Sequence, residues 1–262
     1  MIEDIKSLPP LPASISKIQE LCMMSEVDVN ALAKVIESDP MLSANILKAA
    51  NSPLYGMSRE ISSIHQAMML FGISMIRGFA AANAIKKTLP LDMSPYNTTI
   101  EHLSEVSMMQ QALVRLWYGE ADKSMLPLLM SASFLMELGK LVGAAKIIKM
   151  GQEKLFASQI EESENIAEIE KIFFGMDSYE ISALMFEHWH FESHLIDIFR
   201  AISDSEPQGY GAVLNVVSQA ISLKEVLSEK SIERALGSIE KFGLPLAEFE
   251  KAVAMLKENI QK

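Results

Sequence analysis

The chain has 262 residues, of which 49% are apolar and only 7% aromatic, and its formal net charge is −11. This charge argues against binding to nucleic acid or to an anionic membrane surface, and the single cysteine excludes a disulfide framework. We therefore expect a cytoplasmic protein, because the N-terminus lacks a signal peptide and the apolar runs are too short for membrane insertion. No cofactor is expected.

The first half of the chain predicts a series of short helices with clear beginnings and ends. A helix is expected over 14–24, and Asp28 caps the next one. Asp39 and Pro40 then begin a third helix, since proline fits the first helical position and the acid caps the free N–H groups. This helix ends at Asn51, a residue that tolerates a left-handed turn.

A loop follows, and two more helices come after it. Ser63 and Gln66 have the spacing of a capping box, and the helix that they begin is expected to stop at Gly72. A further helix rich in alanine is predicted over 74–87. Before all of these, the LPPLP segment over 8–12 is expected to be extended and to pack on the first helix as an N-terminal clamp, with an SH3-like ligand as the alternative.

The second half of the chain also carries helical periodicity. Helices are predicted over 99–118, 124–140, 141–150, 152–159, 163–174, 178–190, 192–203, 211–227, 231–242 and 245–260. No convincing strand pattern is present, so the predicted fold class is all-α. The segment 92–99, DMSPYNTT, is the best candidate for a boundary between subdomains.

One candidate for chemistry is a group of histidines near the end of a predicted helix. His190 and His194 are four residues apart, so in a continuous helix they would share a face and could bind a metal together with His188. Glu192 lies one position too late for the HExxH pattern, which turns it away from where a general base is needed. A surface or capping cluster beside a buried Trp189 is the favoured interpretation.

A second candidate is the acid and lysine of the segment FLMELGK. Glu137 and Lys140 lie beside Gly139 on an apolar helix, where they would form either a remnant of a site or the point at which the helix reaches solvent. Nucleophilic catalysis has little support, because Cys22 falls on the apolar face of the first helix and is expected to be a small core residue.

Four segments together resemble one family. LPPLP, VIESDPML, ANSPLYG and ISSIHQAMMLFG are similar to the HDOD domain, a helical output module of bacterial signalling proteins related to HD-type phosphohydrolases. The resemblance is most specific over 8–72 and continues more loosely to GYGAVLNVVSQA. It implies a helical N-terminal part, 1–92, packed on an HD-like helical part, 93–262, which together form one unit.

The resemblance also implies where a metal site would have been. HD enzymes bind a divalent metal through a His, a His-Asp pair and a later Asp, and the metal activates water. These positions fall on His102, on Met136 and Glu137, and near Gln219. A thioether and an uncharged amide do not suit Mg²⁺ or Mn²⁺, so we expect a degenerate site without metal and no catalytic residue.

The favoured function is therefore a non-enzymatic regulatory protein that acts through contacts with protein partners in a signalling pathway. Asn51, Ser52, Tyr55 and Arg77 are the candidate contact residues. The alternative for Asn51 and Tyr55 is that they hold their own loop, and the alternative for Arg77 is an ion pair with Asp39 or Glu37. Two other functions stay open: residual phosphohydrolase activity, and nucleotide sensing by the former active-site cavity.

Overall fold

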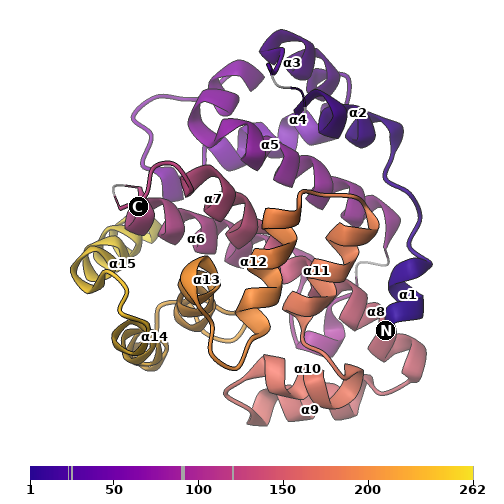
Figure 1. Cartoon of the computed structure of the whole chain (residues 1–262), viewed down its shortest axis with the longest axis vertical. Coiled ribbons are helices and arrows are strands. Elements are labelled where there is room, and N and C mark those ends of the chain that lie inside the picture. The colour runs from indigo at the N-terminus through magenta and orange to yellow at the C-terminus, as the bar shows by residue number, and fades with distance from the viewer. Residues whose placement is uncertain (23, 25, 90–91, 120, 262) are drawn as a thin grey trace. The chain divides into compact units, whose positions relative to one another are not determined.

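In the computed structural model, the described residues (1–22, 24, 26–89, 92–119 and 121–261) contain helices and one isolated antiparallel bridge, between Ile221 and Val226 (Figure 1). The α-helices are α1 Ile2–Lys6, α2 Ala13–Cys22, α3 Val29–Glu37, α4 Pro40–Ala50, α5 Ile64–Thr88, α6 Ile100–Tyr118, α7 Leu126–Leu135, α8 Gly139–Met150, α9 Glu153–Glu162, α10 Ile166–Phe174, α11 Ser178–His188, α12 Ser193–Ser203, α13 Gly209–Ala220, α14 Glu229–Phe242 and α15 Leu246–Ile260. The 3₁₀ turns are η1 Pro53–Tyr55, η2 Ser94–Tyr96 and η3 Met136–Leu138. The predicted all-α fold is confirmed.

The residues form two compact units that are each discontinuous in sequence. Unit 1 consists of Met1–Pro9, Thr88–Gln110 and Ala132–Leu246, and unit 2 consists of Pro10–Lys87, Gln111–Ser131 and Ala247–Lys262. The expected single boundary between residues 92 and 93 does not coincide with these units, since each unit draws on segments from both sides of it.

Helix caps in unit 2 follow the sequence signals closely. The carboxylate of Asp28 accepts hydrogen bonds at the beginning of α3, and that of Asp39 accepts one from the N–H of Leu42 at 3.1 Å. Asn51 ends α4 as predicted, but its φ of −93° is not left-handed. The left-handed residue is Gly56, with φ 58°, at the end of the 3₁₀ turn η1.

The break in α5 lies where the sequence predicts it. Gly72 has φ 74° and ψ 166°, which are not helical values, so residues on its two sides form two helical stretches. The hydroxyl of Ser63 accepts from the N–H of Gln66 at 3.2 Å, as in a capping box. The Gln66 side chain accepts from the N–H of Ser62 at 2.9 Å, one residue further back than the pattern predicts.

The N-terminal segment is attached to unit 1 by polar contacts. The short helix α1, which the sequence signals missed, places Asp4 2.8 Å from the ammonium group of Lys146. The indole N–H of Trp189 donates to the carbonyl of Pro9 at 3.1 Å, and the ring of His188 lies 3.2 Å from the carbonyl of Leu8. The segment was predicted to pack on the first helix, 14–24, whereas these contacts of Leu8 and Pro9 are made with the end of α11.

Two stretches, 64–88 and 126–150, are long and apolar enough to cross a membrane by length and composition alone. However, 67% and 89% of their most apolar windows are buried inside the protein. Core helices of a folded unit have the same properties, so these stretches are weak evidence for membrane insertion.

Candidate functional site

A buried network of charged side chains lies in unit 1, where η3 passes into α8. Glu137 and Lys140 are one helical turn apart and point to the same side. The Nζ atom of Lys140 lies 2.7 Å from Oε2 of Glu137 and 3.7 Å from Oε1 of Glu170, which comes from α10. None of the three side chains is more than 4% exposed. The alternative that this segment reaches solvent is therefore wrong.

The ammonium group of Lys140 is surrounded by groups that favour a positive charge. It donates to the hydroxyl of Ser178 at 2.7 Å and lies 5.1 Å from the ring centre of Tyr179. Burial disfavours the ammonium, but the carboxylates of Glu137 and Glu170 outweigh it and raise the pKa of Lys140 above its ordinary value. Lys140 is therefore a permanent cation at the centre of the network.

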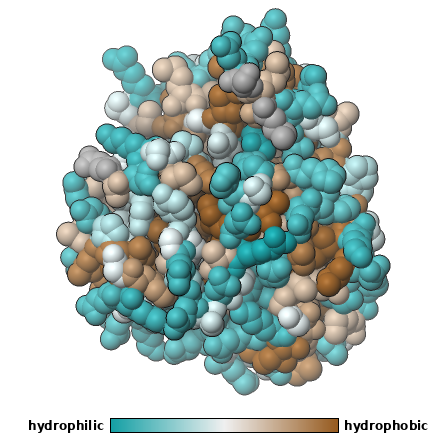
Figure 2. Space-filling view, in the orientation of Figure 1, coloured by the Kyte–Doolittle hydropathy of each residue, from teal (hydrophilic) through white to brown (hydrophobic). Residues whose placement is uncertain are grey.

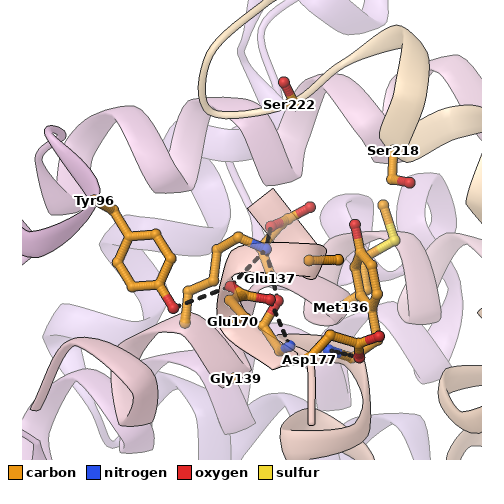
Figure 3. Close-up of polar contacts among 12 residues, drawn as sticks. Tyr96, Met136, Glu137, Gly139, Glu170, Asp177, Ser218 and Ser222 are labelled. Atoms are coloured by element: carbon orange, nitrogen blue, oxygen red, sulfur yellow. Dashed lines mark hydrogen bonds and ion pairs between the residues drawn. The ribbon is translucent and has the colours of Figure 1, made fainter. Parts of the chain in front are cut away.

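Glu170 is held from three sides (Figure 3). Its Oε1 accepts from the hydroxyl of Tyr96 at 3.0 Å, and its Oε2 accepts from the backbone N–H of Ser178 at 2.7 Å. Burial raises the pKa of Glu170, while Lys140 and the bond from Ser178 lower it in part. Burial, together with the neighbouring Glu170, also raises the pKa of Tyr96, so this phenol stays a donor.

Gln110 connects the network to the turn after α13. Its amide nitrogen donates to Oε1 of Glu137 at 2.8 Å and to the carbonyl of Ile221 at 2.9 Å, and Gln110 is 0% exposed. Both oxygens of Glu137 are thereby engaged, one by Gln110 and one by Lys140.

Close backbone packing fixes the position of the network. The N–H of Gly139 donates to the hydroxyl of Ser182 at 2.9 Å, and that hydroxyl donates to the carbonyl of Met136 at 3.0 Å. A Cβ atom on Gly139 would lie 2.0 Å from the carbonyl oxygen of Ser178. Only glycine lets η3 approach α11 this closely.

Three of the four positions that the HD pattern assigns to metal ligands, His102, Glu137 and Gln219, are engaged by other groups of the protein. The ring of His102 lies 3.2 Å from the carbonyl of Leu223 and is 38% exposed. The amide of Gln219 hydrogen-bonds with the side chains of Asn215 and Ser238. Within the described part of the chain, no group of three His, Cys, Asp or Glu residues could hold a metal ion.

The histidine cluster is not built on a continuous helix. Helix α11 ends at His188, His190 has a left-handed φ of 57°, and α12 begins only at Ser193. The premise that His190 and His194 share one helical face is therefore wrong, because the chain turns between them. Trp189 is buried, as predicted.

The ANSPLYG loop of unit 2 surrounds a shallow hollow of about 480 Å³. Two of the candidate contact residues hold this loop. The amide of Asn51 donates to the carbonyls of Leu47 and Ile61 at 2.9 and 2.8 Å, and accepts from the N–H of Ile61 at 2.8 Å. Tyr55 is 4% exposed, and its hydroxyl donates to Gln111 at 2.6 Å. The residues that line the hollow, which we call the loop surface, are Asn51, Ser52, Pro53, Gly56, Met57, Ser58, Arg59, Glu60 and Asn259.

One of the two acids that Arg77 was expected to pair with has a lysine beside it. Asp39 lies 2.8 Å from the ammonium of Lys87, and this contact lowers the pKa of the Asp39 carboxyl. The pairing of Arg77 with Asp39 or Glu37 stays a prediction, and nothing local in the sequence indicated the contact between Lys87 and Asp39.

Sequence reasoning missed four members of the buried network: Tyr96, Gln110, Glu170 and Ser178. For Glu170 a signal was available, because it lies three or four residues from Ile166, Phe173 and Phe174 and so falls on the apolar side of α10. An acid in that position requires a buried partner. Tyr96 and Gln110 come from segments distant in sequence, and nothing local points to them.

The model of the HDOD domain matches residues 8–205 of the chain. No match was found among curated proteins. Over 99% of its length the chain is similar to a proposed phosphohydrolase from Shewanella amazonensis, with 18% identity, a TM-score of 0.68 and 96% of that chain covered.

Two further solved structures have the same fold. A proposed signal transduction protein from Marinobacter aquaeolei has 20% identity and a TM-score of 0.68, with 99% of this chain and 60% of that one covered. An HDOD domain protein of unknown function from Geobacter sulfurreducens has 20% identity and a TM-score of 0.62, with 97% and 90% covered. At these identities the likeness shows the fold alone.

Proposed function

This chain belongs to the HDOD domain family, and we propose that it is a non-enzymatic regulatory protein of signal transduction that acts through contacts with other proteins. The observation that carries the proposal is the position of Lys140, whose ammonium lies between the carboxylates of Glu137 and Glu170. This ammonium group already balances the charge of the carboxylate at the only one of the four HD positions that carries one. We also propose a bacterial cytoplasmic location, since the similar structures come from bacteria.

The chemistry of the donors supports the loss of the metal. Of the four positions, only Glu137 offers a carboxylate, and both of its oxygens already accept from Lys140 and Gln110. Met136 offers a thioether, which is a poor ligand for Mg²⁺ or Mn²⁺. A metal entering here would meet the buried positive charge of Lys140, which repels it.

For the contact surface we propose the exposed part of the loop surface. Tyr55 is buried and supports the surface from below, and Asn51, although it lines the hollow, uses its amide to hold the loop. Met57 is 45% exposed, and Arg59 near it is exposed as well. An apolar and a cationic side chain next to a hollow are well suited to anchor a partner.

Metal content and phosphodiester hydrolysis test the proposed loss of enzymatic function. The purified protein is incubated in turn with Mn²⁺, Mg²⁺ and Fe²⁺, dialysed, analysed for bound metal and assayed with bis(p-nitrophenyl) phosphate. We expect neither stoichiometric metal nor turnover above a protein-free control. Tightly bound metal that is lost together with turnover in a His102→Ala variant would overturn the proposal and establish residual phosphohydrolase activity.

A thermal-shift screen with nucleotides tests the sensing alternative. We expect no stabilisation, because Glu137, Lys140 and Glu170 are buried and closed to solvent.

Affinity capture from the native cell tests the contact surface. The proteins compared are wild type, Arg59→Glu and the control Lys6→Glu, which changes an exposed lysine of unit 1. Partners should be lost only with Arg59→Glu. An identical partner set for all three proteins would remove the loop surface from the proposal.

A further inference from the structure

Helix α10 buries an acid and exposes a large apolar side chain. Six of its nine residues are apolar, yet the one fully buried residue in this completely described helix is Glu170. Ile172 is 72% exposed. A helix on the surface of a folded unit normally buries its large apolar side chains and exposes its acids, whereas α10 leaves Ile172 without cover and Ile169 and Phe173 only half-buried.

The buried network is the reason why Glu170 lies inside. Glu170 is drawn inward by the ammonium of Lys140 and by the hydroxyl of Tyr96. Since successive residues of a helix are turned by about 100°, fixing Glu170 toward the interior turns Ile172 away from it. The apolar exposure is therefore built into the fold of unit 1.

The apolar surface around Ile172 includes the half-buried Ile169 and Phe173 and continues onto the neighbouring helix α9. The two helices lie side by side, and the rings of Phe156 and Phe173 are 5.0 Å apart between them (Figure 1). Leu155, next to Phe156, is 53% exposed. Figure 2 shows an apolar area near these two helices, at the lower edge of the view, with hydrophilic residues beside it. We call Leu155, Ile169, Ile172 and Phe173 the α9–α10 patch.

The surroundings of the patch are strongly acidic. Residues 152–174 contain six glutamates and two lysines, and unit 1 as a whole contains 23 acidic and 11 basic side chains. Lys171 is engaged by Asp177 at 3.1 Å, and the ammonium of Lys224 is bound by backbone carbonyls at the end of α9. The other lysine of this stretch, Lys154, is exposed on α9 and is a single charge against Glu161, Glu162 and Glu168.

We propose that the α9–α10 patch is a docking surface for a basic amphipathic helix of a partner protein, which presents leucine-like residues to the patch and lysines or arginines to its acidic rim. This inference rests on the proposed function as a protein that acts through contacts, and it adds a second surface, in unit 1. The charge of the rim selects against acidic partners and accelerates the encounter with basic ones.

A pair of synthetic peptides tests the docking surface. Both are amphipathic helices of about 18 residues with the same leucine positions, and one carries lysines on its polar side where the other carries glutamates. Binding of each fluorescent peptide is measured by anisotropy for the full chain, for Ile172→Ser and for Met69→Ser. Met69 is 89% exposed on α5, outside the patch, and is the matched control.

We expect the lysine peptide to bind wild type and Met69→Ser equally, to bind Ile172→Ser about tenfold more weakly, and to weaken further on going from about 50 to about 500 mM NaCl. The glutamate peptide should not bind.

Equal weakening by both substitutions, or equal binding of both peptides, would overturn the proposal. So would a dimer in sedimentation that Ile172→Ser dissociates, since the patch would then be covered by a second copy. These outcomes are independent of the metal and hydrolysis assays, which alone decide on enzymatic function.

Discussion

The Nζ atom of Lys140 lies 2.7 Å from the Oε2 atom of Glu137, and neither side chain is more than 4% exposed. With Glu170 3.7 Å away on the other side, one ammonium group neutralises part of the charge of two carboxylates in an environment of low dielectric constant. A buried arrangement of this kind adds little net stability as a whole, but removing one partner leaves charges without compensation. This asymmetry makes the network testable.

Replacing Lys140 by methionine should destabilise unit 1 severely. The substitution keeps most of the side-chain volume but leaves Glu137 and Glu170 buried without a cation, which typically costs about 3–5 kcal/mol. Urea unfolding at neutral pH measures the loss. The control is Lys6→Met, because Lys6 is 67% exposed and its pair with Glu3 is long, so at most about 1 kcal/mol should be lost. Equal effects of the two substitutions would contradict a central role for Lys140.

Glu170→Gln should change how stability depends on pH. Burial raises the pKa of Glu170 in the folded state, so between its unfolded and folded pKa values the folded protein holds a proton that the unfolded chain has lost. In that window stability falls as pH rises. Glutamine cannot ionise and can still accept from the N–H of Ser178. The variant should therefore gain stability relative to wild type as pH is raised from about 4.5, as measured by urea unfolding at several pH values. A constant difference across this range would contradict the prediction.

Gly139→Ala should be among the most damaging single substitutions. The added Cβ would lie 2.0 Å from the carbonyl oxygen of Ser178 and 2.8 Å from the hydroxyl of Ser182, and backbone cannot move as a flexible side chain does. Overpacking of this kind costs about 1–3 kcal/mol or more. Gly237→Ala is the matched control: an added Cβ there would have no atom within 4 Å, so α14 should gain up to about 1 kcal/mol. Thermal unfolding should separate the two variants in opposite directions.

Local signals in the sequence identified most helix ends, because the caps depend on residues two to four positions apart. Asp28, Asp39 and the Ser63–Gln66 pair all act where their spacing indicates. One end was predicted too late: the helix predicted over 211–227 ends at Ala220 in the structure. The apolar run continues past this point into the turn that carries the bridge at Ile221. Tertiary contacts, including the bond from Gln110 to the carbonyl of Ile221, decide that end.

The candidate site could be predicted only in part. Glu137 and Lys140 were visible as an acid and a lysine on an apolar helix, but their burial depends on Tyr96 and Gln110, which come from other segments. The two-unit division was also beyond local signals, since each unit combines segments far apart in the chain. Spacing rules describe neighbours along a helix, and they contain no information on which helices meet.

Asn51→Ala should loosen the ANSPLYG loop. The substitution removes two bonds that the amide donates, to Leu47 and Ile61, and one that it accepts from the N–H of Ile61. Each such bond contributes about 0.5–1.5 kcal/mol, and exposure to water returns part of the loss, so we expect a decrease of about 1–2 kcal/mol. Arg59→Ala, on the same loop surface but without a described ion pair, should change stability by less than about 0.5 kcal/mol. Hydrogen exchange of the N–H of Ile61 gives a local readout, because Asn51→Ala should accelerate it and Arg59→Ala should not. If both variants leave that exchange rate unchanged, Asn51 does not hold the loop, and its amide is again available for a partner.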